Sequence, residues 1–400
     1  MKPPVSALVH LLVGLLVAIL GAAESVRGVS ATRLEPASAQ GAPQNDTQPA
    51  PKKDPLLKLA QPWPSADEMR RAKADAETRP LFATTDPLSF TLSGDFKTIN
   101  EDHDPNSTKR YPAELRVTRE DGEVEVIPVN LRARGHVRRM AAACEFVPLR
   151  VEFKKALTKG TLFEGQSALK LVVQCKTGGI YGQYLLREYT AYRTLNLLTP
   201  RSLRARFSKV TYVNSGTERV MGTRYGMFLE DDDDVARRME GRAVQLQRVL
   251  FKDVDADTLE TMTIFEYLIG NTDFSLFSRH NVILVQTPDL LLYPIPYDFD
   301  YSGYVNPPYA SPARTLSIKT VDERLFRGPC RSVEQVDSAL TNFKAKRDAV
   351  LGLPDLVPDV DKQTRQEVKT FLDGFYSAIK NPKDVRRLFV DGACSKVREE

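Results

Sequence analysis

The sequence lacks several features that would assign a protein directly to a functional class. Its net charge is only +4, from 56 basic and 52 acidic side chains, so it does not indicate a nucleic-acid binder or a polybasic membrane anchor. None of its four cysteines forms a C-x-x-C pair, which argues against a zinc site. A hydrophobic share of 42% over 400 residues excludes fibrous, collagen-like and fully disordered chains. The chain is long enough for one large two-lobed domain or two modest ones.

A single long apolar run is present, at the N-terminus. Lys2 precedes apolar residues 5–20, and the small residues Gly21, Ala22 and Ala23 follow, which predicts a secretory signal peptide over 1–23. An uncleaved anchor is the alternative, because the run approaches the roughly 20 residues that span a bilayer. No Cys follows the run, so a lipid anchor is not expected. We expect a secreted, periplasmic or cell-surface protein, associated with a membrane only if the signal is uncleaved.

The four cysteines are even in number, in a chain expected to enter an oxidising compartment. Disulfides are therefore the default interpretation, and four cysteines allow three connectivities. Pairing Cys144 with Cys175 and Cys330 with Cys394 keeps each bond within one half of the expected fold. Four buried free thiols are the alternative.

Composition divides the rest of the chain into three parts. Residues 24–86 are rich in Ala, Pro, Gln and Ser with little apolar periodicity, which predicts a flexible tether with a short helix at 65–77 capped by Ser65. Residues 87–229 alternate apolar and polar side chains and predict a β-rich lobe with one helix. Residues 230–395 are mainly helical in pattern. Together they predict an α+β, two-lobed arrangement. The expected strands are 88–94, 113–119, 124–135, 148–155, 167–175, 206–213 and 219–229, and the helix is 183–197.

Residues 257–303 contain the most informative constellation. A helix is expected to start at Asp257 and to end at Gly270, just before a polar loop that contains Asp273. A strand pair at 282–286 and 290–296 lies between Asn281 and the segment Asp298-Phe299-Asp300. Three carboxylates and one amide should thus meet at one end of a hairpin.

Phosphoryl transfer needs this kind of set, because its transition state is stabilised by positioning and by metal ions that bridge phosphate oxygens. Hard divalent cations prefer oxygen ligands. Each residue taken singly also fits an ordinary turn. The order of Asp273, Asn281, strand pair and Asp298-Phe299 follows that of protein kinases, with a longer first gap, and favours the chemical interpretation.

Three motifs resemble the CotH family of spore-coat atypical protein kinases: LIGNTDF at 268–274, His280-Asn281, and PIPYDFD at 294–300. The similarity extends as a pattern over most of 87–391. The resemblance implies a two-lobed atypical protein-kinase-like fold, with a β-rich N-lobe and an α-rich C-lobe. It also implies transfer of the ATP γ-phosphate, with Mg²⁺ or Mn²⁺, to Ser or Thr of an exported protein.

The resemblance assigns roles to individual residues. Asp273 is the catalytic base or orienting carboxylate, and Asn281, Asp298 and Asp300 are the metal ligands. Further ATP-binding candidates are Lys170, Glu188, Arg134, Gly135 and Glu230. Lys170 would neutralise phosphates and be held by Glu188, as in the kinase Lys–Glu pair, or both would be ordinary surface residues.

Two further candidates have open alternatives. Arg134 and Gly135 resemble a family loop near the nucleotide, although His136 departs from the family's small residues, and an ordinary turn fits equally. Glu230 would contact the adenine or ribose. The acidic run 230–234 could bind calcium or a basic substrate, or form a turn that caps the next helix. A binding module without catalysis and a nucleotidyl transferase are the alternative functions.

Overall fold

Alternating apolar residues between Leu88 and Leu229 form seven strands, as the sequence predicts. The structure is a computed structural model that describes residues 55–119 and 121–394; the predicted signal peptide and residues 24–54 of the tether lie outside the described residues. The strands are β1 (Leu88–Gly94), β2 (Tyr111–Thr118), β3 (Val124–Ala133), β4 (Leu149–Phe153), β5 (Ala168–Val173), β6 (Ala205–Asn214) and β7 (Arg219–Leu229).

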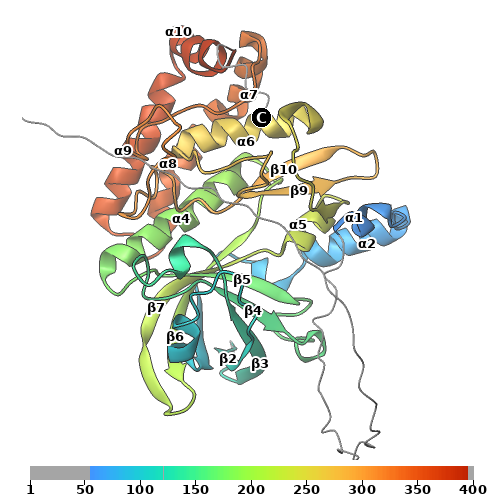
Figure 1. Cartoon of the computed structure of the whole chain (residues 1–400), viewed down its shortest axis with the longest axis vertical. Helices are drawn as coiled ribbons and strands as arrows, with labels where there is room; N and C mark the ends of the chain where they lie inside the picture. The colour runs from blue at the N-terminus through green and yellow to red at the C-terminus, as the bar shows by residue number, and fades with distance from the viewer. Residues whose placement is uncertain (1–54, 120, 395–400) are drawn as a thin grey trace, which may run out of the picture. The chain divides into compact units, whose positions relative to one another are not determined.

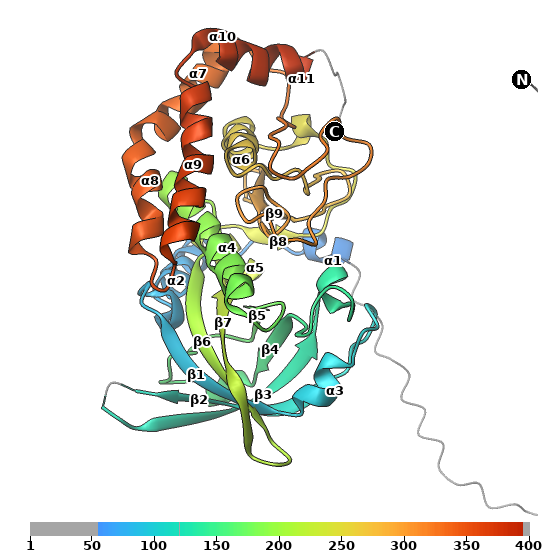
Figure 2. The same cartoon turned by 90° about the vertical axis from the view of Figure 1, so that its left-hand side faces the viewer.

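These strands close into a barrel in the order β1-β2-β3-β4-β5-β7-β6 (Figures 1 and 2). All neighbouring pairs are antiparallel except β1 and β6, whose parallel pairing sets Leu88 opposite Ser208 and closes the barrel. Side chains such as Leu92, Leu115 and Leu131 are fully buried in its core. A short helix, α3 (Phe96–Asn100), follows β1.

The expected two-lobed, atypical protein-kinase-like fold is wrong. The structure has a closed seven-stranded mixed barrel, a separate three-stranded sheet in the order β10-β9-β8, and helices. Alternation predicts which residues form strands and which face is buried, but it does not name the partner of a strand. The β1–β6 pair joins residues more than a hundred positions apart, so local pattern gave no sign of closure.

The second half of the described chain supplies most of the helices. Helix α4 (Gly179–Leu198) lies along β6 and β7 and packs on its other side against α8 and α9 (Figure 2). The small sheet comprises β8 (Arg242–Val244), β9 (Val282–Gln286) and β10 (Leu292–Pro296). The other helices are α5 (Asp232–Arg238), α6 (Ala256–Ile269), α7 (Val333–Ala345), α8 (Arg347–Leu356), α9 (Lys362–Ala378), α10 (Pro382–Val385) and α11 (Gly392–Cys394).

Residues 55–86, within the predicted tether, are folded against the rest of the described chain. Helices α1 (Pro55–Ala60) and α2 (Ala66–Glu77) form there, and Ser65 and Glu68 make the predicted N-terminal cap as a reciprocal capping box. The Arg204 guanidinium donates to the carbonyls of Ala76 at 2.6 Å and Glu77 at 3.0 Å, at the end of α2. Composition missed this docking because the contacts come from distant residues.

Both preferred disulfides are confirmed. Cys144 bonds to Cys175, and Cys330 bonds to Cys394, which leaves no free cysteine in the described chain. The first bond ties the loop after β3 to the end of β5, and the second ties the segment before α7 to α11. Of the helices in residues 55–394, none is long and apolar enough to cross a membrane.

Candidate functional site

The β9–β10 hairpin brings Asn281 and Asp298 together, as the sequence predicts. Gly270 ends α6 in the left-handed conformation, with φ 66°, while Asp255 caps its start instead of the expected Asp257. Because Val282 pairs with Pro296, the next residues outward also meet, and the Tyr297 N–H donates to the Asn281 carbonyl at 3.0 Å. Asp298 therefore follows directly beside Asn281 at the hairpin base.

Asn281 and Asp298 both have a backbone conformation that is rare outside glycine. Their φ values are +54° and +67°, and such conformations persist only where the surroundings enforce them. The Asp298 N–H donates to the buried Tyr192 hydroxyl on α4 at 2.8 Å. Phe299, which has no exposed surface, packs between Tyr192 and Phe265. Contacts with helices α4 and α6 thus fix the backbone at Asp298 and the direction of its side chain.

Two side chains orient the Asp273 carboxylate. His280 Nε2 lies 3.1 Å from Oδ1, and the Asn281 amide donates to Oδ2 at 3.1 Å and to the Asp273 carbonyl at 2.7 Å. The hydrogen bond to Asp273 is the main cause that raises the pKa of His280. The Asp273 side chain is 41% exposed. It is both held in place and accessible to a substrate, a combination expected of a proton acceptor. In the sequence, His280 stands out only as part of the His280-Asn281 motif.

The Arg327 side chain holds the backbone of the loop around Asp273. Arg327 donates to the Thr272 carbonyl at 2.6 Å and to the Phe274 carbonyl at 2.9 Å, the backbone oxygens of the two residues on either side of Asp273. Its guanidinium also lies 5.1 Å from the centre of the Phe274 ring. Arg327 is three residues before Cys330, so the second disulfide fixes the segment that carries it.

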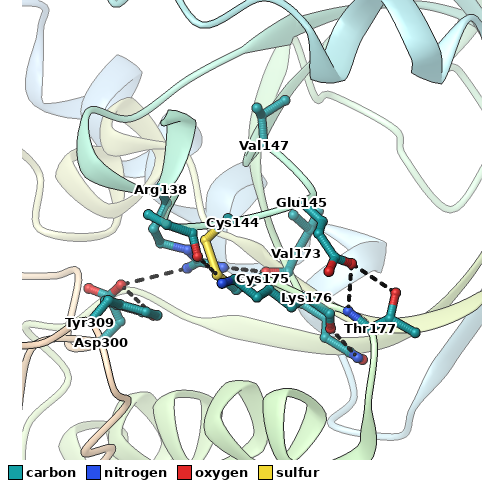
Figure 3. The surroundings of a disulfide bond; sticks show 12 residues. Arg138, Cys144, Glu145, Val147, Val173, Cys175, Lys176, Thr177, Asp300 and Tyr309 are labelled. Carbon is teal, nitrogen blue, oxygen red and sulfur yellow. Dashed lines mark hydrogen bonds and ion pairs between the residues drawn. A yellow bond between two sulfur atoms is a disulfide. The ribbon is translucent and has the colours of Figure 1, made fainter. Parts of the chain in front are cut away.

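A buried cluster of two carboxyl groups, those of Glu188 and Asp300, lies near Asp298. Arg138 Nη1 is 3.8 Å from Glu188 Oε2. It also lies 3.8 Å from Asp300 Oδ2, to which the Tyr309 hydroxyl donates at 3.0 Å (Figure 3). Burial, together with the nearby Asp298 charge, raises the pKa of Asp300 to about 7. Burial, with the Asp300 charge, also raises the pKa of Glu188.

The first disulfide supports this cluster. Arg138 lies in the loop that Cys144 ties to Cys175, and it donates a further hydrogen bond to the Val173 carbonyl at the end of β5 (Figure 3). In the sequence, this loop stands out only because His136 departs from the family's small residues. No local signal identified Arg138 as the partner of Glu188 and Asp300.

The expected Lys170–Glu188 pair is not formed. Lys170 Nζ binds Asp232 Oδ1 at 2.7 Å and lies 4.3 Å from the centre of the Tyr297 ring. Glu188 faces Arg138 instead. The reason is geometric: Lys170 is on β5 opposite Leu229 of β7, which brings it to the acidic run that follows β7.

Glu230 is not available to a nucleotide through its side chain, contrary to expectation. It is fully buried, and its carboxylate accepts hydrogen bonds from Arg204 at 2.8 Å and from Arg238 at 2.8 Å. The acidic run does cap a helix: Asp231 is the N-cap of α5 and accepts from the Asp233 N–H at 3.0 Å. Burial raises the pKa of Asp231 to about 6.

Arg134 and Gly135 form a turn after β3, with Gly135 at φ +89°. Arg134 is half-buried, and its positive charge lowers the pKa of Glu188, which places it beside the carboxyl cluster. Within the described residues its guanidinium has no hydrogen bond or ion pair. It is therefore a cation that a ligand's anionic group could reach.

A cavity of about 860 Å³ lies beside the hairpin base. Its volume is within the range of small-molecule sites. Tyr297 forms part of its wall, so the cavity and Asp298 are adjacent along the chain. Its lining comprises an apolar group, Ala243, Val244, Val282 and Ile283; the acids Asp231, Asp232 and Asp233; the bases Lys58, Arg150 and Arg279; and Gln61, Gln245 and Tyr297.

The oxygen atoms at the hairpin base fit a divalent cation that arrives with phosphate. In the described chain, no residue donates a hydrogen bond to the Asp298 carboxylate or to the Asn281 amide oxygen. Asp300, also expected as a ligand, is held by Tyr309 and Arg138. The described residues contain no group of three or more His, Cys, Asp or Glu at metal-binding distances. Mg²⁺ commonly takes one or two protein oxygens plus phosphate and water, so such a cage is not required.

Comparison with known proteins adds no family: no family model matches the chain, and no curated protein matches it significantly. The resemblance to the CotH family rests on the three motifs described above.

Proposed function

We propose that this protein is a metal-dependent phosphotransferase of CotH type, which transfers the γ-phosphate of ATP to Ser or Thr of exported proteins. One observation carries the proposal. Asp273, oriented by His280 and Asn281, stands at the same hairpin base as the Asp298 carboxylate, which no described residue hydrogen-bonds, next to a cavity large enough for a nucleotide.

In this proposal, different residues bind the adenine, the phosphates and the cation. The apolar part of the cavity would take the adenine, and Lys170, beside Tyr297, together with Arg134 would supply positive charge toward the phosphates. Asn281 and Asp298 would hold the divalent cation. When bound, that cation neutralises phosphate oxygens and so lowers the barrier to transfer.

Asp273 would act on the acceptor. The hydroxyl oxygen of Ser or Thr forms a bond to the γ-phosphorus, the bond from that phosphorus to the β,γ-bridging oxygen breaks, and ADP leaves. The hydroxyl proton passes to the Asp273 carboxylate, which His280 and Asn281 keep in a fixed orientation.

Export is part of the proposal. The two disulfides fit an oxidising compartment, where such bonds persist. We infer that the predicted N-terminal signal directs the chain there, and that the substrate is a protein of the same compartment.

The test uses the oxidised full chain with ATP labelled at either the γ or the α phosphate, plus Mg²⁺ or Mn²⁺, and a Ser/Thr-rich acceptor protein. The proposal predicts transfer of the γ label alone. Transfer of the α label would instead identify a nucleotidyl transferase, and ATP binding without transfer would identify a binding module. Asp289→Asn is a matched control, because Asp289 is exposed in the turn between β9 and β10, at the other end of the hairpin.

A further inference from the structure

The first described residues form part of the cavity wall. Helix α1 and the turn after it lie beside β8, and Figure 1 shows α1 next to α5. Lys58 and Gln61 line the cavity directly. This segment, which we call the strap and define as residues 55–63, precedes the barrel in sequence.

One arginine anchors the strap. Arg242 of β8 donates to the carbonyls of Lys58 at 3.0 Å, Leu59 at 3.0 Å and Gln61 at 2.9 Å. These are carbonyls at a helix end, where the helix itself provides no partner. The same guanidinium lies 4.0 Å from the centre of the Trp63 ring. The strap is thus held by these polar contacts, by the ion pair of Lys58 with Asp233, and by Leu59, which packs against the apolar cluster around the small sheet.

The strap also changes the charge of the cavity. Lys58 Nζ lies 2.9 Å from Asp233 Oδ1. With the strap in place, the lining has three acidic side chains and three basic ones, Lys58, Arg150 and Arg279. Without it, three acids would face two bases, and an anion would be disfavoured. An ammonium group has three donors, so the bond to Asp233 leaves Lys58 able to contact a ligand.

We propose that Lys58 is a further nucleotide-binding residue, supplied by the strap, and that strap docking and nucleotide binding stabilise one another. The inference rests on the proposed function in one respect, since it takes the nucleotide as the ligand. Coupling of this kind is reciprocal: if the docked strap increases affinity for ATP, bound ATP holds the strap in place to the same extent.

The chain provides its own reporter, because Trp63 is its only tryptophan. The experiment measures acrylamide quenching of Trp63 emission in the oxidised full chain, with and without ATP and Mg²⁺, and the ATP dissociation constant by calorimetry. ATP should reduce quenching of the wild-type protein. Lys58→Met should abolish that protection and raise the dissociation constant about two- to fivefold, as for a partly exposed charge.

Lys73→Met is the matched control. Lys73 is on α2, its Nζ is 3.7 Å from Glu240, and it does not line the cavity, so affinity and quenching should match the wild type. Equal ATP affinity and unchanged quenching in Lys58→Met would overturn the strap proposal and leave the proposed function standing. Protection of Trp63 by ATP without phosphotransfer would support the strap and refute the transfer reaction. Absence of ATP binding by the wild type would overturn both.

Discussion

Glu266 on α6 makes the stability of the protein depend on pH. Its side chain is 1% exposed, and neither carboxyl oxygen has a hydrogen bond of normal geometry in the described chain. Burial raises the pKa of Glu266 from 4.5 to about 8, while the neighbouring Asn271 and Arg327 oppose the shift. The folded protein therefore keeps this carboxyl neutral at pH 7, whereas the unfolded chain ionises it.

The sign and size of the effect follow from that difference. A pKa that is higher in the folded state adds stability that is complete below about pH 4.5 and is lost as the pH rises to about 8. The loss is roughly 1 kcal/mol by pH 5 and roughly 4 kcal/mol by pH 8. Glu266→Gln removes the ionisation and keeps the volume. The free energy of unfolding of the variant, relative to that of the wild type, should therefore increase by roughly 3 kcal/mol between pH 5 and pH 8.

The assay is chemical denaturation of the oxidised wild type and variant at several pH values between 5 and 8. Any constant cost of the glutamine amide cancels, since only the change with pH is compared. Glu101→Gln, at an exposed glutamate, is the control and should follow the wild type at every pH. A stability difference for Glu266→Gln that stays constant or narrows as pH rises would refute the reasoning.

Three further predictions test the site and the disulfides. Asp273→Asn should lower phosphotransfer about 100- to 10,000-fold while ATP affinity stays near the wild-type value, because the proposed function assigns its carboxylate to the acceptor hydroxyl; an equal loss of ATP binding would assign it to the metal site. Asp298→Asn should make ATP binding weak or independent of Mg²⁺ in calorimetry, and unchanged metal-dependent binding would remove Asp298 as a ligand. Replacing Cys144 and Cys175 together by Ser should lower the free energy of unfolding by roughly 3 to 4 kcal/mol, given their sequence separation of 31; denaturation curves that coincide with the wild type would contradict this.

Features of the site that depend on neighbouring residues could be predicted from the sequence. Gly270 ends α6, and the two strands that follow pair as expected, because helix caps and strand alternation are local. The approach of Asn281 to Asp298 follows from that hairpin alone. The disulfide pairing was also correct.

Features that depend on distant partners could not be predicted. Arg138 takes the position beside Glu188 that was assigned to Lys170, and two arginines enclose Glu230, yet nothing near these residues in sequence indicates the pairing. The closure of the barrel through β1 and β6 is of the same kind. Charged residues on a strand or helix show that a partner is needed, but only the folded chain shows which one is within reach.

The bond between Cys330 and Cys394 gives the protein an order of maturation. Asp273 is held by Arg327, Arg327 lies in the segment that Cys330 fixes, and the partner of Cys330 lies 64 residues further along the chain. A nascent or reduced chain thus lacks the covalent part of this support. We expect the site to reach its final geometry only after Cys394 has been synthesised and the two thiols have been oxidised.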